Sequence, residues 1–201
     1  LFPFISDRQE RDVMMNTVAP VWDGNETWMV LGGAGLFAAF PLVYSTVLSA
    51  LYMPIILMVI ALIFRGVAFE FRFKAYKTTH LWDQAFIWGS ILSSFLQGVI
   101  LGAYIQGIET TNGIYTGGGL DWLTPFSLFT GISVVVLYAT LGCGWLIFKT
   151  EKMLQNRMFE LMPKLLISLL MIFVCVSIYT PLAHPQIAER WFSQPQLFYF
   201  S

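Results

Sequence analysis

Two carboxylates give this chain its clearest prospect of chemistry. Asp23 and Glu26 stand three residues apart in the segment 19–28, and no charged residue follows them until Arg65. On a helix, residues at this spacing share a face. A carboxylate held at membrane depth is expensive and indicates a proton or ion pathway. The alternative is that both side chains lie among lipid head groups and only cap a helix; the residues alone leave the two equally open.

Arg65 ends the charge-free stretch that follows these carboxylates. A cation beside an apolar run usually extends to the membrane interface. The sharper hypothesis is a buried counter-ion for Asp23 or Glu26. The stretch 27–64 is nearly twice as long as the roughly 20 residues that one span needs. It should therefore fold as a helical hairpin, which returns Arg65 to the depth of the two carboxylates.

The composition sets the fold class. Hydrophobic residues make up 57% of the chain and charged residues 11%, against about 25% charged residues in soluble domains. We therefore predict an all-α, polytopic membrane bundle, one domain over residues 1–201 and a fragment of a longer subunit. The expected spans are 20–42, 46–68, 84–108, 122–148 and 165–188.

The first expected hairpin requires a sharp corner and an early start. The corner should fall at 41–45 or at 49–54. Asn16 or Thr17 is the expected N-cap of the first span, with Pro20 in its first turn. This start brings Asp23 to the membrane boundary.

Basic residues predict the orientation. They gather on one side of the expected spans, and the loop 109–121 contains no Lys or Arg. Because Lys and Arg concentrate in cytoplasmic loops, the loop 109–121 should lie outside, with Arg190 the only exception to the pattern. The basic residues on the cytoplasmic side are Arg8, Arg11, Arg72, Lys74, Lys77, Lys149, Lys152, Arg157 and Lys164.

Histidine and cysteine give little support for a metal or haem site. His80 and His184 are isolated, and the expected spans otherwise lack histidine. We therefore expect no haem held by histidine in this chain. Cys143 and Cys175 lie in apolar runs, which is typical of buried thiols.

Small residues in the first expected span favour helix packing. Gly32, Gly33 and Gly35 allow close backbone approach between membrane helices. Nothing resembling a soluble enzyme's phosphate loop or nucleophile elbow is present, and a net charge of −1 gives no sign of nucleic-acid binding.

The segments 19–28 and 32–41, with 64–72 and the pair Trp82-Asp83, resemble subunit II of the bd-type (cytochrome bd or cyanide-insensitive) quinol oxidases. The likeness is strong over 7–88 and becomes a hydropathy match beyond. Members often have proline where this chain has Gly66. The motif residues that carry the resemblance are Trp22, Asp23, Gly24, Asn25 and Trp28.

The resemblance implies a haem-free subunit of a respiratory quinol:O₂ oxidoreductase in a bacterial or archaeal cell membrane. Subunit I would hold haems b and d, and quinol would be the substrate of the complex. This chain would stabilise subunit I and deliver cytoplasmic protons through Asp23, with weaker support for Glu26 and with Arg65 as charge partner. Some members hold a quinone in subunit II, and small single-span subunits are further expected partners.

Two other functions fit the same residues. A proton-coupled secondary transporter could use Asp23, Glu26 and Arg65, although transporters usually show paired repeats and broken helices at the midplane. A structural membrane scaffold would need the charges only as helix caps.

Overall fold

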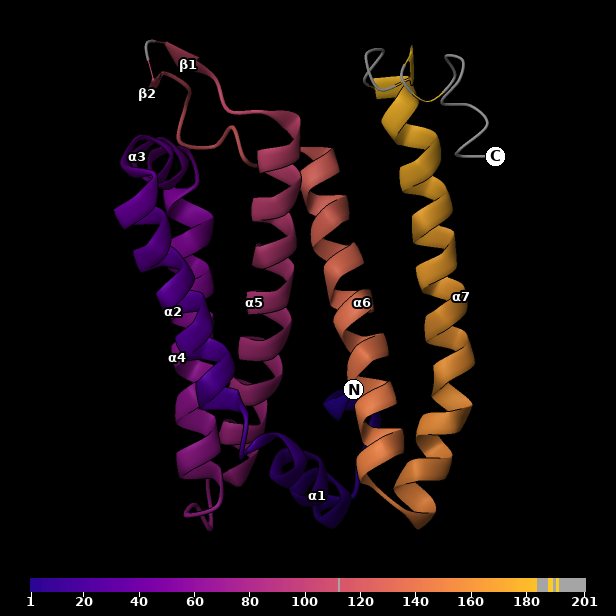
Figure 1. Ribbon diagram of the computed structural model, residues 1–201. Helices are drawn as coiled ribbons and strands as arrows, with labels where there is room; N and C mark the ends of the chain where they lie inside the picture. The colour runs from indigo at the N-terminus through magenta and orange to yellow at the C-terminus, as the bar shows by residue number, and fades with distance from the viewer. Residues whose placement is uncertain (112, 184–187, 190, 192–201) are drawn as a thin grey trace.

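The computed structural model describes residues 1–111, 113–183, 188–189 and 191. Long helices run side by side, and a short helix crosses one end of the bundle (Figure 1). We call this the α1 end, and the opposite end, which carries a small β-hairpin, the hairpin end. The helices are a 3₁₀ turn (Phe2–Phe4), α1 (Arg8–Val18), α2 (Trp22–Ala39), α3 (Pro41–Ala50), α4 (Tyr52–Arg72), α5 (Thr79–Gln106), α6 (Pro125–Lys149) and α7 (Lys152–Ala183).

Four of these helices, α4 to α7, are long and apolar enough to cross a membrane. The shortest of them, α4, has 21 residues, and a span needs about 20. The predicted polytopic α-helical membrane fold is therefore confirmed. The expected span 165–188 runs partly beyond the described residues, and α7 itself begins earlier, at Lys152.

The first hairpin is built from three helices. The chain breaks at Phe40 and again at Leu51, with the short apolar helix α3 between the two breaks. The second break lies within the expected corner 49–54, whereas the residues 41–45 are part of α3. Pro41 occupies the first turn of α3, where its missing N–H costs nothing. The second long helix of the hairpin, α4, consequently begins at Tyr52 rather than near residue 46.

The predicted N-cap is wrong. Asn16 and Thr17 lie in the last turn of α1, and α2 begins only at Trp22. Pro20 explains the break, because proline cannot donate the backbone hydrogen bond that would carry α1 onward. Val21 precedes α2 without a side-chain cap.

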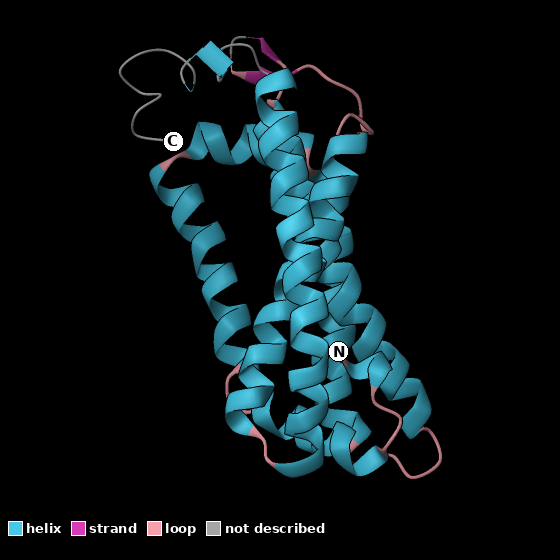
Figure 2. Ribbon diagram, turned by 90° about the vertical axis from the view of Figure 1, so that its right-hand side faces the viewer, coloured by secondary structure: helices cyan, strands magenta, loops and turns pink. Residues whose placement is uncertain are grey.

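Close helix contact occurs between α5 and α6. A Cβ atom added at Gly98 would lie 2.6 Å from the carbonyl oxygen of Thr130, and one at Gly131 would lie 2.7 Å from the Phe95 ring. These two helices therefore pack backbone to backbone, as small residues allow in membranes. In Figure 2 the bundle is turned by 90°: most of the long helices run nearly parallel, whereas one long helix slants away from them and a short helix lies across its upper end.

A β-hairpin closes the connection between α5 and α6. Strands β1 (Thr110–Thr111) and β2 (Ile114–Tyr115) pair antiparallel. The Thr46 hydroxyl donates to the Gly113 carbonyl at 2.9 Å, which joins the hairpin to α3. Burial and the neighbouring Asp121 carboxylate raise the pKa of the Tyr115 phenol.

Candidate functional site

The α1 end contains a cluster of four charged side chains, of which Arg72 and Asp83 are buried and the others partly exposed. We call this the ion cluster: Arg11, Asp12, Arg72 and Asp83. Arg72 Nε donates to Asp83 at 2.5 Å, and Arg11 Nη1 donates to the same carboxylate at 2.9 Å. Arg72 also pairs with Asp12. Only 2% of Arg72 and 6% of Asp83 is exposed. The cluster therefore joins α1 to the end of α4 and the start of α5.

An apolar cluster surrounds these charges. The Phe2 ring lies under both guanidinium groups, with centroid distances of 5.1 Å to Arg11 and 5.7 Å to Arg72. On the far side of α1, Arg157 of α7 donates to Glu10 at 2.7 Å. Segments from α1, α4, α5, α6 and α7 thus meet at this end. The buried members are Phe2, Ile5, Met14, Met15, Phe69, Ile87, Cys143, Leu146, Leu154 and Met158.

Trp22 anchors the first turn of α2 against α4. Its ring stacks on Phe69, with centroids 5.1 Å apart and an interplanar angle of 9°. A Cβ atom at Gly66 would come within 3.2 Å of the same ring. Because residue 66 has no side chain, the indole ring of Trp22 can pack against α4 at this position.

The two predicted carboxylates face different surroundings. Asp23 is exposed on α2, and its carboxylate makes no hydrogen bond or ion pair within the described residues. Glu26 is half-buried, and its Oε1 atom is buried without a hydrogen-bond partner there. Helical spacing had suggested one shared face; in the structure one carboxylate points out of the chain and the other into it.

Arg65 lies near Glu26 rather than beside Asp23. The positive charge of Arg65 acts on Glu26, although the two make no direct ion pair in the described chain. The Nε atom of Arg65 is buried and has no hydrogen-bond partner among the described residues. Of the three ionisable groups that we expected to converge, Glu26 and Arg65 are therefore the oppositely charged pair that lies near each other.

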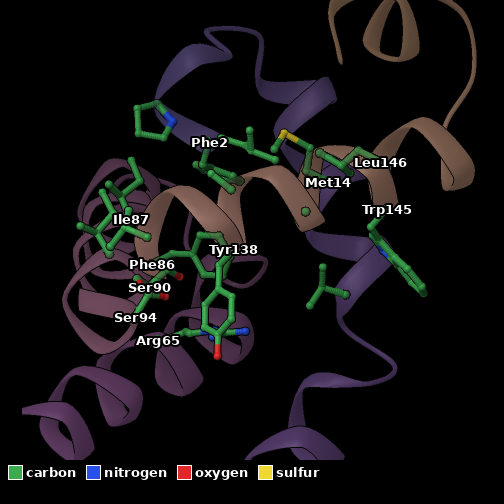
Figure 3. A pocket seen from close by; sticks show the side chains of 17 residues that line it. Phe2, Met14, Arg65, Phe86, Ile87, Ser90, Ser94, Tyr138, Trp145 and Leu146 are labelled. Atoms are coloured by element: carbon green, nitrogen blue, oxygen red, sulfur yellow. Dashed lines mark hydrogen bonds between the residues drawn. The ribbon is translucent and has the colours of Figure 1, made fainter. Parts of the chain in front are cut away.

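A pocket of about 330 Å³ adjoins Arg65. Figure 3 shows Arg65, Ser90, Ser94 and Tyr138 gathered towards one end of it, and Phe2, Met14 and Leu146 towards the other. The Oγ atom of Ser90 is a second buried polar atom without a partner in the described chain. The walls are mostly apolar, so the pocket combines a polar end with an apolar body.

The glycines expected to pack helices face open space within this chain. A Cβ atom at Gly24, Gly32, Gly33 or Gly35 would meet nothing within 4 Å. Trp28, from the same helix, is 72% exposed. Asn25 lies in α2, but its side chain is outside the described part. Sequence reasoning thus identified a helix whose small residues meet no partner among the described residues, and we call its exposed surface the open side of α2.

Metal ligands are not grouped in the described ranges. No set of three or more His, Cys, Asp and Glu side chains is placed to hold an ion there. His80 is exposed at the start of α5, and His184 lies outside the described residues. Cys143 is buried, whereas Cys175 is exposed on α7.

Sequence reasoning missed the ion cluster. It used Arg11 and Arg72 only as markers of orientation and Asp83 only as part of a motif. A signal was present, because Arg72 and Asp83 flank the short connection between α4 and α5 and must therefore lie at the same end of the bundle. Asp12, 60 residues before Arg72, had no comparable signal.

The fold and the site define a polytopic helical membrane protein with ionisable groups at one end of its bundle. A family model described as "Cytochrome bd terminal oxidase subunit II" matches residues 1–200. The chain belongs to this family.

Curated relatives agree with the match. "Probable cytochrome oxidase subunit 2" of Haemophilus influenzae is 34% identical over 167 residues, covering 78% of this chain and 44% of the relative. "Cytochrome bd ubiquinol oxidase subunit 2" of Bacillus subtilis is 34% identical over 161 residues, covering 78% and 47%. "Cytochrome bd-I ubiquinol oxidase subunit 2" of Escherichia coli K12 is 34% identical over 159 residues, covering 74% and 41%. The matched part spans less than half of each relative.

Proposed function

We propose that this chain is a haem-free part of subunit II in a bd-type quinol:O₂ oxidoreductase, and that it stabilises subunit I and delivers protons to it. Family membership and the names of the relatives support the oxidoreductase. Haems b and d would reside in subunit I, where quinol oxidation and O₂ reduction would take place. The observation that carries the proton role is Asp23, an exposed carboxylate on an apolar helix.

The open side of α2 is the proposed contact with subunit I. A carboxylate facing lipid is costly, so a membrane protein normally covers it with protein or water. Gly32, Gly33 and Gly35 lie two to three turns further along the same helix, and they leave room for another helix to approach α2 there. Contact with the haem-bearing subunit would satisfy both features and place Asp23 where protons can cross between subunits.

The α1 end is the proposed cytoplasmic end of the bundle. Arg8, Lys74 and Lys152 lie in or beside helix ends there, whereas the β-hairpin connection lacks Lys and Arg. The positive-inside rule then places the hairpin end outside a bacterial or archaeal cell membrane. In this orientation Asp23 sits near the cytoplasmic source of protons.

A second function, quinone binding, is favoured by the pocket beside Arg65. The buried Nε of Arg65 and Oγ of Ser90 can both donate hydrogen bonds. A quinone offers carbonyl acceptors on a ring with an apolar tail, which fits a pocket with a polar end and an apolar body. The residues that would hold the ring are Arg65, Ser90 and Tyr138.

The proton role is tested by replacing Asp23 with Asn in the whole oxidase. Asp23→Asn keeps the shape but removes the titrating proton. We expect normal haem content and about tenfold slower quinol-driven O₂ consumption. This is less than the roughly 10²- to 10⁴-fold that a general acid or base contributes, because Asp23 would relay protons and would not act on the reacting bond. Glu70→Gln, a change to an exposed carboxylate on α4, is the matched control. Unchanged turnover in an assembled Asp23→Asn oxidase would reduce Asp23 to a helix cap.

The same preparation separates the alternatives. A secondary transporter or a structural scaffold would purify without haem absorption, whereas an oxidase subunit would bring haem spectra with it.

A further inference from the structure

Trp22 and Glu26 are the side chains that face α4 from the first turns of α2. They stand four residues apart, so they lie on the same side of the helix. Trp22 contacts Phe69 and the backbone of Gly66, and Glu26 approaches Arg65. Asp23 is turned about 100° from Trp22 around the helix axis, because an α-helix has 3.6 residues per turn. The rotation of this turn therefore decides where Asp23 points.

The partner of Trp22 is held firmly. Phe69 is buried in the apolar cluster at the α1 end. Its ring meets Phe86 edge-on at 5.2 Å, and Phe86 meets Phe2 edge-on at 5.1 Å. Phe2 in turn lies under the guanidinium groups of the ion cluster. A continuous row of aromatic rings thus connects Trp22 to the ion cluster.

The second anchor of this turn is weaker. Glu26 and Arg65 attract each other electrostatically but form no direct ion pair within the described chain. Val21, the residue before α2, supplies no side-chain cap. Without the indole, little in this chain would oppose rotation of the first turn of α2.

We propose that Trp22 is a positioning residue for proton transfer: its stack on Phe69, in the space left by Gly66, fixes the rotation of α2 so that Asp23 faces subunit I and Glu26 faces Arg65. This inference rests on the proposed proton role of Asp23. Trp22 itself exchanges no proton. Its effect passes through the direction in which Asp23 points.

Turnover per haem in the whole oxidase is the first test. We expect Trp22→Ala to lower it about three- to tenfold, and Trp22→Phe, which can still stack, to stay within about twofold of the parent. Adding Trp22→Ala to Asp23→Asn should cause no further loss, because residues acting through one group are not additive. Losses that multiply, or full turnover per haem in assembled Trp22→Ala, would overturn the proposal.

Gly66→Ala keeps the test valid if Trp22→Ala fails to assemble. The added methyl group would lie 3.2 Å from the indole and must displace it by a few tenths of an ångström. We expect a loss of about two- to threefold in turnover per haem. Gly144→Ala, which adds the same atom on α6 at an ordinary contact distance of 3.4 Å from the end of the Met162 side chain, is the matched control. Equal turnover in the two variants would contradict the role of the stack.

A measurement independent of turnover separates this inference from the proton role. In an oxidase carrying Cys175→Ser, the substitution Asp23→Cys allows labelling with a water-soluble maleimide. We expect Gly66→Ala to change the labelling rate at position 23 at least about threefold, and Gly144→Ala to leave it unchanged. A changed rate with a fully active Asp23→Asn oxidase would reject the proton role and retain the positioning. An unchanged rate would reject the positioning.

Discussion

The ion cluster and the start of α2 both lie at the α1 end of the bundle, but their charged side chains differ in whether they have an opposite charge beside them. In the ion cluster, Arg72 and Asp83 are almost fully buried and each contacts two opposite charges. On α2, Asp23 is exposed and has no ionic partner within the described residues. Buried charges are tolerated when they are paired. The charges of the ion cluster are paired with one another, although the Nη2 atom of Arg72 has no hydrogen-bond partner among the described residues, whereas Asp23 has no opposite charge beside it there.

The difference separates two uses of charge in a membrane protein. A paired, desolvated cluster fixes the arrangement of helices, and removing one member leaves the others buried without compensation. A single carboxylate on an apolar helix side stabilises nothing in its own chain. It gains a function only when another surface covers it.

The largest effect is expected for Arg72→Met in the ion cluster. Asp12 and Asp83 would lose their shared cation, although Asp83 keeps Arg11. Removing one partner of a buried pair costs about 3–5 kcal/mol, and we expect the lower end of this range. The heat-denaturation midpoint of the oxidase should fall by several degrees. Lys74→Met, which breaks an exposed pair with Glu70, should cost under about 0.5 kcal/mol; equal shifts would mean that the ion cluster stabilises little.

Two glycine substitutions sharpen the comparison between closed and open surfaces. Gly98→Ala adds a methyl group 2.6 Å from a backbone oxygen of α6, and such overpacking costs about 1–3 kcal/mol. Gly33→Ala adds one in open space, so the chain itself should keep its stability. We expect Gly33→Ala instead to reduce co-purification with subunit I. Normal co-purification of this variant, and of Gly33→Leu, would show that this side of α2 faces lipid.

The smallest effect is expected for the outer contact of α1. Arg157 pairs with Glu10, and 44% of the Arg157 side chain is exposed. Solvent screens such a pair, so Arg157→Gln should cost about 0.2–1 kcal/mol. Thermal denaturation at low and high salt checks this, because the loss should shrink as salt rises. If Arg157→Gln lowered the stability as much as Arg72→Met, the pair between Arg157 and Glu10 would stabilise the bundle as much as the ion cluster does.

Hydropathy predicted the elements whose boundaries are marked by charge. The expected spans 84–108 and 122–148 overlap α5 and α6 closely, because charged residues flank both. Helix α7 begins 13 residues before the expected last span, since it continues through the charged segment 152–164. Charges end the apolar part of a helix but need not end the helix.

The candidate site was only partly predictable. Asp23 and Glu26 were found because carboxylates beside an apolar run are rare, but their different exposure depends on how Trp22 packs. That packing depends on Gly66, 44 positions further along the chain, which hydropathy treats as one more small residue. A search for apolar spans could not find the charged helix α1, although α1 contacts α4, α5 and α7 at the end of the bundle.

Helix α1 is made early but completed late during synthesis. Its partner Asp83 emerges from the ribosome about 70 residues after Arg11, and Arg157 about 150 residues after Glu10. Until then Arg11 and Asp12 can only be solvated by water or lipid head groups. The pair between Glu10 and Arg157 can therefore form only after the start of α7 has been made. The position of α1 is thus completed after the preceding helices have been synthesised.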